Sequence, residues 1–172
     1  LRQWSEVSWP KTAVGYSEAS EVLSDRKKWV PFNKGGGFKK WYGNQSFLVN
    51  WGNDGEEINK ETIKNYSEDA LSWKISNEER YFERGLTWSK ISSGNFAVRY
   101  IPDGFIFSTA GSVVIPDDED LWILAAFLNS NVCSYTLKVQ NPTMNFQIRD
   151  VASIPICIEE LDYKNPLISL GK

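Results

Sequence analysis

The segment from Tyr81 to Lys90 combines several side chains that can recognise DNA. A guanidinium, two hydroxyls and an ammonium lie here beside an indole ring. Arginine and lysine match the O6 and N7 acceptors of guanine, and serine or threonine hydroxyls can bond to bases or phosphates. A polar loop whose groups are satisfied internally is the alternative. The candidates for base or phosphate contacts are Arg84, Thr87, Ser89 and Lys90.

A second candidate region is the basic stretch from Arg26 to Lys40, which contains six basic residues and no acid. It includes a glycine loop, Gly35-Gly36-Gly37, whose backbone amides and neighbouring lysines could contact a DNA phosphate. A plain surface turn fits the same spacing. The candidates for phosphate contacts are Lys34, Lys39 and Lys40.

The net charge of −3 argues against a protein that holds nucleic acid by bulk electrostatics. The charge is unevenly distributed, because nine acids and only four bases lie between Asp54 and Glu83. One surface could therefore attract phosphate while another repels it. A solvated surface with uneven charge is the simpler interpretation.

Several kinds of site are excluded by composition. The chain has no histidine, which removes Ser-His-Asp and Cys-His catalysis and any histidine-ligated metal. Cys133 and Cys157 lack zinc-site spacing, and two thiols in a reducing cytosol are favoured over a disulfide. No glycine pattern matches a nucleotide or S-adenosylmethionine site. Asn141-Pro142-Thr143-Met144 lacks the aromatic that an adenine-pocket motif needs, so it predicts a turn. We expect no catalytic, cofactor or metal residues in this chain.

The elements that would position these residues form an expected α+β fold, a small mixed sheet with β-hairpins and packed helices. No apolar run approaches the length of a membrane span. We expect a helix over 17–28 capped by Ser17, a turn cluster at 52–55 and a partly helical polar stretch over 56–83. We also expect a hairpin of 96–101 with 105–107, a buried helix over 121–128, and a turn with short apolar strands over 141–158. The surest strand is 47–49.

Several ordered motifs resemble the C-terminal part of PglX-type adenine-specific DNA methyltransferases. These enzymes belong to BREX phage-defence systems and are similar to fused restriction-modification enzymes. The resemblance covers roughly residues 33–158. The motifs lie at Lys40-Trp41-Tyr42-Gly43-Asn44 and at residues 49–58, 85–91, 105–112 and 141–156.

The resemblance implies a target-recognition domain that reads double-stranded DNA and performs no chemistry. An upstream methyltransferase domain would bind S-adenosylmethionine and methylate the adenine selected here. We expect a cytoplasmic protein that contacts that domain and other defence-system subunits. The expected divisions are a helical lead-in or linker at 1–32, the recognition-like domain at 33–158, and a truncated following element at 159–172. Trp41, Trp88, Phe146 and Ile154 are expected in the core.

Three other functions remain open at this stage. The chain could be a docking domain of the same defence complex, with its acidic stretch from Asp54 to Glu83 as the interface. It could be a carbohydrate-binding module, because eight tryptophans supply stacking surfaces. A free-standing hydrolase would need paired carboxylates in a pocket, which sequence spacing neither shows nor excludes.

Overall fold

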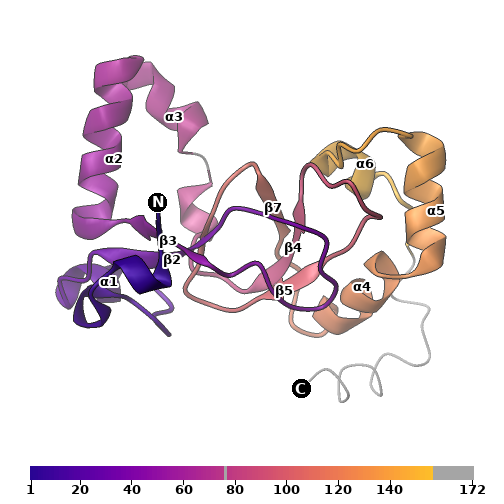
Figure 1. Cartoon of the computed structure of the whole chain (residues 1–172), viewed down its shortest axis with the longest axis horizontal. Helices are drawn as coiled ribbons and strands as arrows, with labels where there is room; N and C mark the ends of the chain where they lie inside the picture. Colours follow the sequence, from indigo (N-terminus) through magenta and orange to yellow (C-terminus); the bar gives the residue numbers. More distant parts are fainter. Residues whose placement is uncertain (76, 157–172) are drawn as a thin grey trace. The chain divides into compact units, whose positions relative to one another are not determined.

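The computed structural model describes residues 1–75 and 77–156, and the chain divides into two compact units (Figure 1). Unit 1 contains residues 1–33, 45–84 and 102–107. Unit 2 contains residues 34–44, 85–101 and the chain from Ser108 onward. The predicted element at 159–172 lies outside the described residues. The predicted domain limits at 32 and 158 stay a prediction.

Unit 1 is built on a four-stranded sheet with the order β1-β3-β2-β6. The strands are β1 (Arg2–Gln3), β2 (Trp29–Asn33), β3 (Phe47–Asn50) and β6 (Ile106–Phe107). β3 runs antiparallel to β1 and β2, whereas β6 runs parallel to β2. Aromatic and β-branched residues favour these strands. The predicted strand at 47–49 is confirmed.

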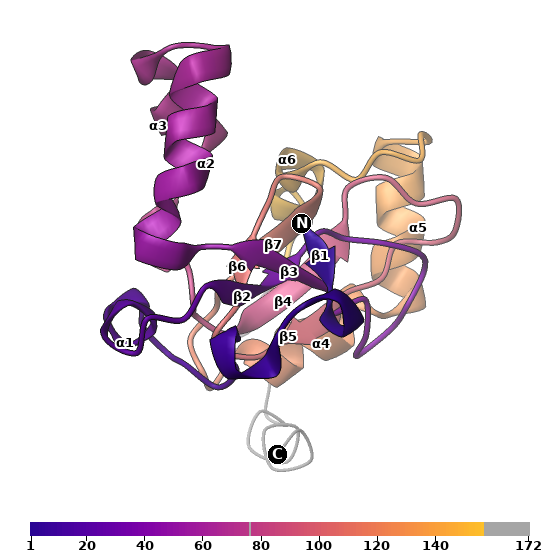
Figure 2. The ribbon, with the colours of Figure 1, turned by 60° about the vertical axis from the view of Figure 1, so that its left-hand side comes forward.

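The helices of unit 1 are α1 (Ala19–Ser24), α2 (Gly52–Asn65) and α3 (Leu71–Lys74), and Figure 2 shows α2 rising from the end of β3. Short 3-10 turns lie at 4–6, 9–11, 68–70 and 78–80. The prediction that 56–83 is partly helical is confirmed. The predicted turn at 52–55 is also present, because Asn53, Asp54 and Gly55 have φ values of 52°, 57° and 73° before the right-handed helix.

The cap predicted for the first helix is wrong. Glu18, not Ser17, is the N-cap of α1, and Glu21 returns a bond to the backbone N–H of Glu18 at 3.2 Å. This reciprocal arrangement satisfies the first backbone donors of the helix. Ser17 instead donates its own backbone N–H to Glu21 at 2.9 Å. The helix is also shorter than predicted, because it ends at Ser24 and not at Lys28.

Unit 2 contains a three-stranded antiparallel sheet with the order β5-β4-β7. Its strands are β4 (Gly85–Ser89), β5 (Arg99–Ile101) and β7 (Gly111–Val114). Its helices are α4 (Leu121–Leu128), α5 (Asn131–Gln140) and α6 (Ile148–Ala152), drawn together in orange and yellow in Figure 1. The apolar run at 121–128 forms the predicted helix. The α+β fold is confirmed.

The core of unit 2 confirms three of the four residues expected to be buried. Trp88, Phe146 and Ile154 belong to one cluster with residues of β4, α4 and α5. The Trp88 ring lies 6.0 Å from that of Phe96, and its Nε1 donates to the Phe146 carbonyl oxygen at 3.0 Å. This hydrogen bond satisfies the polar end of a buried indole. Trp88 therefore joins the sheet to the segment that precedes α6.

The predicted hairpin between 96–101 and 105–107 is wrong. β5 pairs with β4, whereas β6 pairs with β2, so the two strands belong to different sheets. The reason is the backbone of Phe82, whose N–H donates to the Phe105 carbonyl and whose carbonyl accepts from Gly104. The turn after Ile101 is thereby held by a segment distant in sequence. A local turn signal cannot reveal such a partner.

The prediction of apolar strands at 141–158 is also wrong for the part that forms α6. Gln147 is the N-cap of this helix, and its backbone N–H donates to the Asp150 carboxylate at 3.3 Å. A capping box starts a helix even where the apolar residues are short and β-branched. Residues 157 and 158 lie outside the described part of the chain.

Cys133 is fully buried on α5, and burial raises the pKa of its thiol to about 11. Only the thiolate is nucleophilic, so about one part in a thousand is reactive at pH 8. We predict that iodoacetamide leaves Cys133 unmodified at pH 8 in the folded chain and alkylates it in urea. Peptide mass spectrometry checks this, and rapid alkylation without denaturant would contradict the packing of α5.

Among the described residues, no helix is long and apolar enough to cross a membrane. The same part of the chain holds no group of three or more histidine, cysteine, aspartate or glutamate side chains that could bind a metal ion.

Candidate nucleic-acid interface

Residues 34–44 of unit 2 form an exposed loop, named here the basic loop, with three lysines and no acid. Three aromatic side chains are interspersed with these lysines along the loop. Phe38 is 48% exposed, Trp41 is 53% exposed and Tyr42 is 61% exposed. Lysines combined with exposed rings are the features that nucleic-acid-binding surfaces use for phosphates and bases.

The backbone of the basic loop is fixed to the body of unit 2. The Trp41 N–H donates to the Val98 carbonyl at 3.0 Å, and its own carbonyl accepts from Tyr100 at 2.7 Å. The Ser89 hydroxyl donates to the Gly36 carbonyl at 2.7 Å. Within the loop, Asn44 Nδ2 donates to the Gly37 carbonyl at 2.7 Å. The loop is thus anchored at several points while its longer side chains face outward.

The expectation that Trp41 lies in the core is wrong. Trp41 attaches to the end of β5 through its backbone, and its φ of 68° lies in the left-handed region. The indole ring is left more than half exposed by this attachment. An exposed tryptophan is a candidate recognition residue, because large rings provide contact area at low entropic cost.

Lys40 has a positional role in this structure. Its Nζ donates to the carbonyl oxygen of Asn129 at 2.9 Å. Asn129 is buried, and its side-chain amide donates to the Val98 carbonyl and accepts from the Val98 N–H, both at 3.1 Å. The pair ties the basic loop and β5 to the end of α4. A phosphate contact by Lys40 stays a prediction.

We predict that Asn129→Ala destabilises the chain by about 1–3 kcal/mol, since it leaves the buried Val98 N–H without an acceptor. Urea unfolding followed by tryptophan fluorescence measures this loss. The exposed Asn131→Ala is the matched control, with an expected change below about 0.5 kcal/mol. Equal stability of the two variants would contradict the assigned role of Asn129.

The structure places Thr87 and Ser89 inside unit 2. Thr87 is 3% exposed and donates its hydroxyl to the Ser112 carbonyl at 2.8 Å. Ser89 is 6% exposed and supports the basic loop through Gly36. Both hydroxyls donate hydrogen bonds to backbone carbonyl oxygens within this unit. Their direct contact with DNA stays a prediction.

Lys90 follows β4 and is half-buried. Its backbone N–H donates to the Ala110 carbonyl at 3.1 Å, and its carbonyl accepts from Phe146 at 2.7 Å. Ser89 and Lys90 therefore lie in the unit that carries Lys34, Lys39 and Lys40.

Arg84 belongs to unit 1, unlike the six other candidates. Its guanidinium lies 3.9 Å from the Asp103 carboxylate, which also accepts its backbone N–H at 3.0 Å. A guanine contact by Arg84 requires competition with this carboxylate. The role of Arg84 stays a prediction.

Arg99, which is not among the residues predicted from the sequence, is the most completely buried charged side chain of the described residues. It is 1% exposed, and desolvation lowers the pKa of its guanidinium. The available signal was strand alternation, which places Arg99 on the same face of its strand as Ala97 and Ile101. A charged residue between two apolar ones on one strand face indicates a buried charge, which is rare in proteins unless it is paired.

Two curated proteins match almost the whole chain. The adenine-specific methyltransferase PglX of Lacticaseibacillus casei (strain Zhang) is 38% identical over 157 residues, which cover 91% of this chain and 13% of that protein. The adenine-specific methyltransferase BrxX of Escherichia coli O9:H4 (strain HS) is 32% identical over 159 residues, or 91% of this chain and 12% of that protein. The chain is related to one segment of PglX-like methyltransferases. The predicted resemblance is confirmed.

The chain spans only about an eighth of the length of these PglX-type relatives. No model of a protein family matches it. The relatedness is consistent with a fragment of a PglX-like protein, and the α+β architecture described above is the structure of that segment.

Proposed function

We propose that this chain is the DNA target-recognition part of an adenine-specific methyltransferase of a BREX-type defence system. The observation that carries the proposal is the basic loop, where exposed lysines and aromatic rings project from an anchored backbone in a relative of adenine-specific methyltransferases. Binding of S-adenosylmethionine and methyl transfer would belong to an upstream domain of the complete protein. The chain itself would select the site on double-stranded DNA.

In this proposal the two kinds of side chain have different tasks. Lys34 and Lys39 neutralise backbone phosphates, which provides affinity and register without sequence information. Trp41 and Tyr42 contact base edges, or stack on bases unpaired when the target adenine is flipped. Because the backbone beneath them is hydrogen-bonded, little ordering cost is paid on binding.

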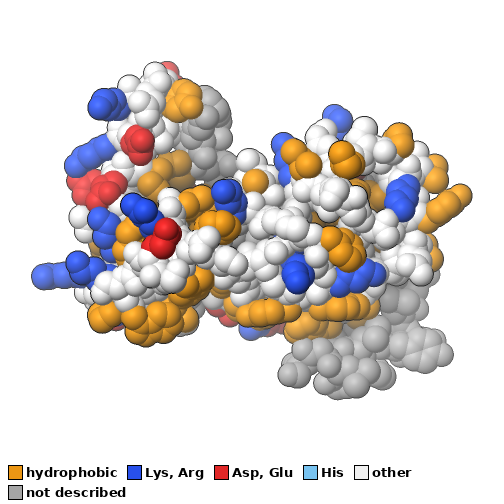
Figure 3. Space-filling view, in the orientation of Figure 1, with side chains coloured by type: hydrophobic (Ala, Val, Ile, Leu, Met, Phe, Trp, Pro, Cys, Tyr) orange, Lys and Arg blue, Asp and Glu red, His pale blue; other side chains and the backbone are white. Residues whose placement is uncertain are grey.

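The distribution of charge favours weak DNA binding whose affinity depends only modestly on salt. On each unit, the lysine and arginine side chains visible in Figure 3 are interspersed with uncharged surface. A protein with few phosphate contacts has a shallow dependence of affinity on salt, since each contact contributes about −0.9 to the slope of log K against log salt.

Fluorescence anisotropy with a labelled duplex tests the proposal. We expect the full chain to bind at low salt, with a slope of about −2 to −4 corresponding to two to four phosphate contacts. An oligosaccharide competitor should have no effect. Absence of DNA binding at 20 mM salt would contradict the proposal, and displacement by oligosaccharide would favour the carbohydrate alternative.

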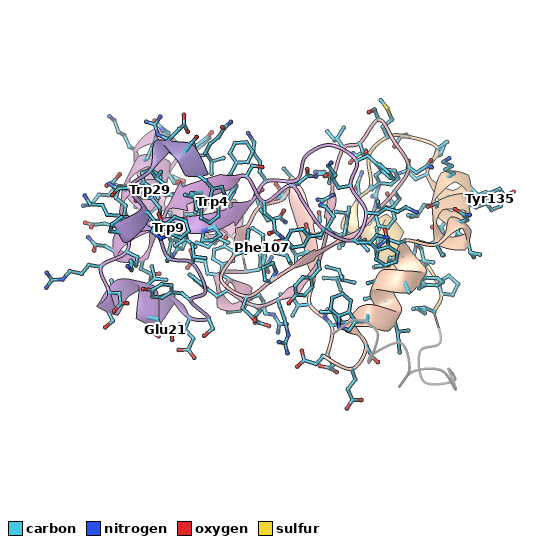
Figure 4. All side chains as sticks on the ribbon, turned by 60° about the horizontal axis from the view of Figure 1, so that its bottom comes forward. Trp4, Trp9, Glu21, Trp29, Phe107 and Tyr135 are labelled. Atoms are coloured by element: carbon cyan, nitrogen blue, oxygen red, sulfur yellow. The ribbon has the colours of Figure 1, made fainter. Side chains whose placement is uncertain are left out.

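The carbohydrate alternative has limited aromatic surface in this structure. Among tryptophans whose side chains are described, only Trp9 and Trp41 count as exposed, and they belong to different units. Trp9 packs on Trp4 with ring centroids 6.0 Å apart, and both are labelled in Figure 4.

Protein docking is supported by one specific observation. Val132, Tyr135 and Val139 lie on one face of α5 and are 68%, 71% and 68% exposed. Figure 4 shows Tyr135 projecting away from the ribbon. An apolar stripe at this spacing is typical of a helix that packs against a partner. Such a contact is compatible with DNA binding by the basic loop.

A further inference from the structure

Arg99 is a buried cation with no acidic partner among the described residues. Its Nη2 donates to the Ser89 hydroxyl at 3.4 Å, a long hydrogen bond. Its Nε is buried and has no hydrogen-bond partner. An unpaired buried charge destabilises a fold by several kcal/mol, and a guanidinium cannot escape this cost by losing its proton. A buried cation without a counter-charge is therefore a candidate functional group.

A small cavity lies beside this guanidinium, below the basic loop. Its lining includes Gly37, Lys39, Ser89, Phe96 and Arg99. The volume of the cavity is ≈ 10 Å³, about the space of a single water molecule. A water can satisfy Nε but brings no negative charge. Two cationic side chains thus line one cavity, and none of the described residues that line it carries a carboxylate.

We propose that Arg99 and Lys39 together receive one phosphate group of the DNA backbone. This inference rests on the proposed function. It adds a buried phosphate-binding site at Arg99, here called the concealed site, to the exposed lysines of the basic loop. A guanidinium presents Nε and one terminal nitrogen as a fork that matches two phosphate oxygens. Nε is the unused donor here, and the bond to Ser89 at the other nitrogen is long enough to be exchanged.

The cavity must widen for a phosphate to enter, and the covering segment can provide this movement. A side chain added at Gly37 would meet nothing within 4 Å, so there is open space around this residue. Gly35 and Gly36 are closely packed, because an added Cβ would lie 2.5 Å from the Ala110 carbonyl oxygen and 2.8 Å from the Asn44 side chain, respectively. The room for movement therefore lies at Gly37. Ser89 links the basic loop to Arg99, because its hydroxyl donates to the Gly36 carbonyl and accepts from the Arg99 guanidinium. Phosphate binding at Arg99 therefore replaces its bond to Ser89, while the hydrogen bonds at Trp41 keep the rest of the basic loop in place.

Arginine Nε–H NMR signals of the unaltered full chain test this site directly. On titration with inorganic phosphate at constant ionic strength, we expect a saturable shift of the Arg99 signal. A short duplex should shift the same signal. The signal of Arg149, a surface residue with a 78% exposed side chain, serves as the control. An Arg99 signal that does not respond to the duplex overturns the proposal, whether or not inorganic phosphate shifts it.

The variant Arg99→Met provides the second test. We expect its melting temperature without ligand to equal or exceed that of the unaltered chain, because a buried charge is replaced by an apolar side chain of similar length. Its affinity for duplex DNA should fall about tenfold, and the salt slope should lose about 0.9. The control Arg149→Met removes an exposed charge and should leave both values unchanged.

The outcomes separate this inference from the proposed function. If the unaltered chain binds no DNA, the proposed function fails and takes the concealed site with it. If the chain binds DNA and folded Arg99→Met binds equally well, the concealed site alone is overturned. If Arg99→Met does not fold, the NMR titration of the unaltered chain decides.

Discussion

Replacement of Lys34 and Lys39 by glutamine is expected to lower the affinity of the chain for duplex DNA by about tenfold or more at 50 mM salt. Both residues belong to the acid-free basic loop, and both side chains are exposed. Each lost phosphate contact removes a charge-assisted hydrogen bond and the release of condensed counterions. The slope of log K against log salt should therefore lose about 1.8. Lys40 is left in place, because its ammonium holds the Asn129 carbonyl.

A matched double variant controls for the change in net charge. Lys64 in α2 and Lys138 in α5 are exposed lysines outside the basic loop, and their replacement by glutamine removes the same total charge. We expect this control to change the affinity by less than about threefold, since neither lysine belongs to the loop proposed to contact phosphates, and charges outside a binding contact are screened by salt. Equal losses in both double variants would show that net charge, not the basic loop, determines binding.

Trp88→Ala is expected to destabilise unit 2 by about 3–5 kcal/mol, the usual cost of truncating a buried tryptophan. Trp88 is 2% exposed, packs against Phe96, and donates to the Phe146 carbonyl. The substitution leaves a cavity between β4 and the segment before α6, and it orphans a buried carbonyl. Because native proteins are only marginally stable, this loss is a large fraction of the total.

Urea unfolding monitored by circular dichroism measures the effect of Trp88→Ala. Trp9→Ala is the control, because Trp9 is 65% exposed and its removal should cost far less. Trp88→Ala should also weaken DNA binding at temperatures where part of the chain is unfolded. A loss of stability below about 1 kcal/mol would contradict the packing described for this core.

The sequence predicted those elements whose signals are local. The uninterrupted apolar run at 121–128 specifies a buried helix, and Phe47 to Val49 specify a strand through β-favouring side chains. The α+β class follows from such elements. Resemblance to PglX-type enzymes was also visible from motifs in sequence order, which two relatives confirm.

The errors arise where distant segments determine the structure. The backbone of Phe82 forms hydrogen bonds with Gly104 and Phe105. As a result, the two strands of the predicted hairpin belong to different sheets. Strand pairing of this kind depends on non-local contacts that a short window of sequence does not contain. Likewise, the exposure of Trp41 follows from backbone bonds to β5, which its residue type does not reveal.

The candidate site shows the same division between residue type and environment. Lys34 and Lys39 are exposed as basic surface residues usually are, and composition alone suggested their phosphate role. Thr87 and Ser89 have suitable hydroxyls, yet both are buried against backbone carbonyls. Strand alternation was the single sequence signal at Arg99, and its burial without an acidic partner among the described residues makes it a candidate.

The most direct test of the central claim is the methylation pattern produced by the complete protein that contains this chain. Single-molecule sequencing would compare cells expressing the unaltered protein and its neighbouring genes with cells expressing a variant of the basic loop. The variant combines Lys39→Gln, Trp41→Ala and Tyr42→Ala, all at exposed positions, and Arg149→Gln serves as the control. If the basic loop reads DNA, methylation at one adenine-containing motif will be lost or relaxed in the loop variant alone. Full methylation of the same motif in the loop variant would contradict the assignment of target recognition to this loop.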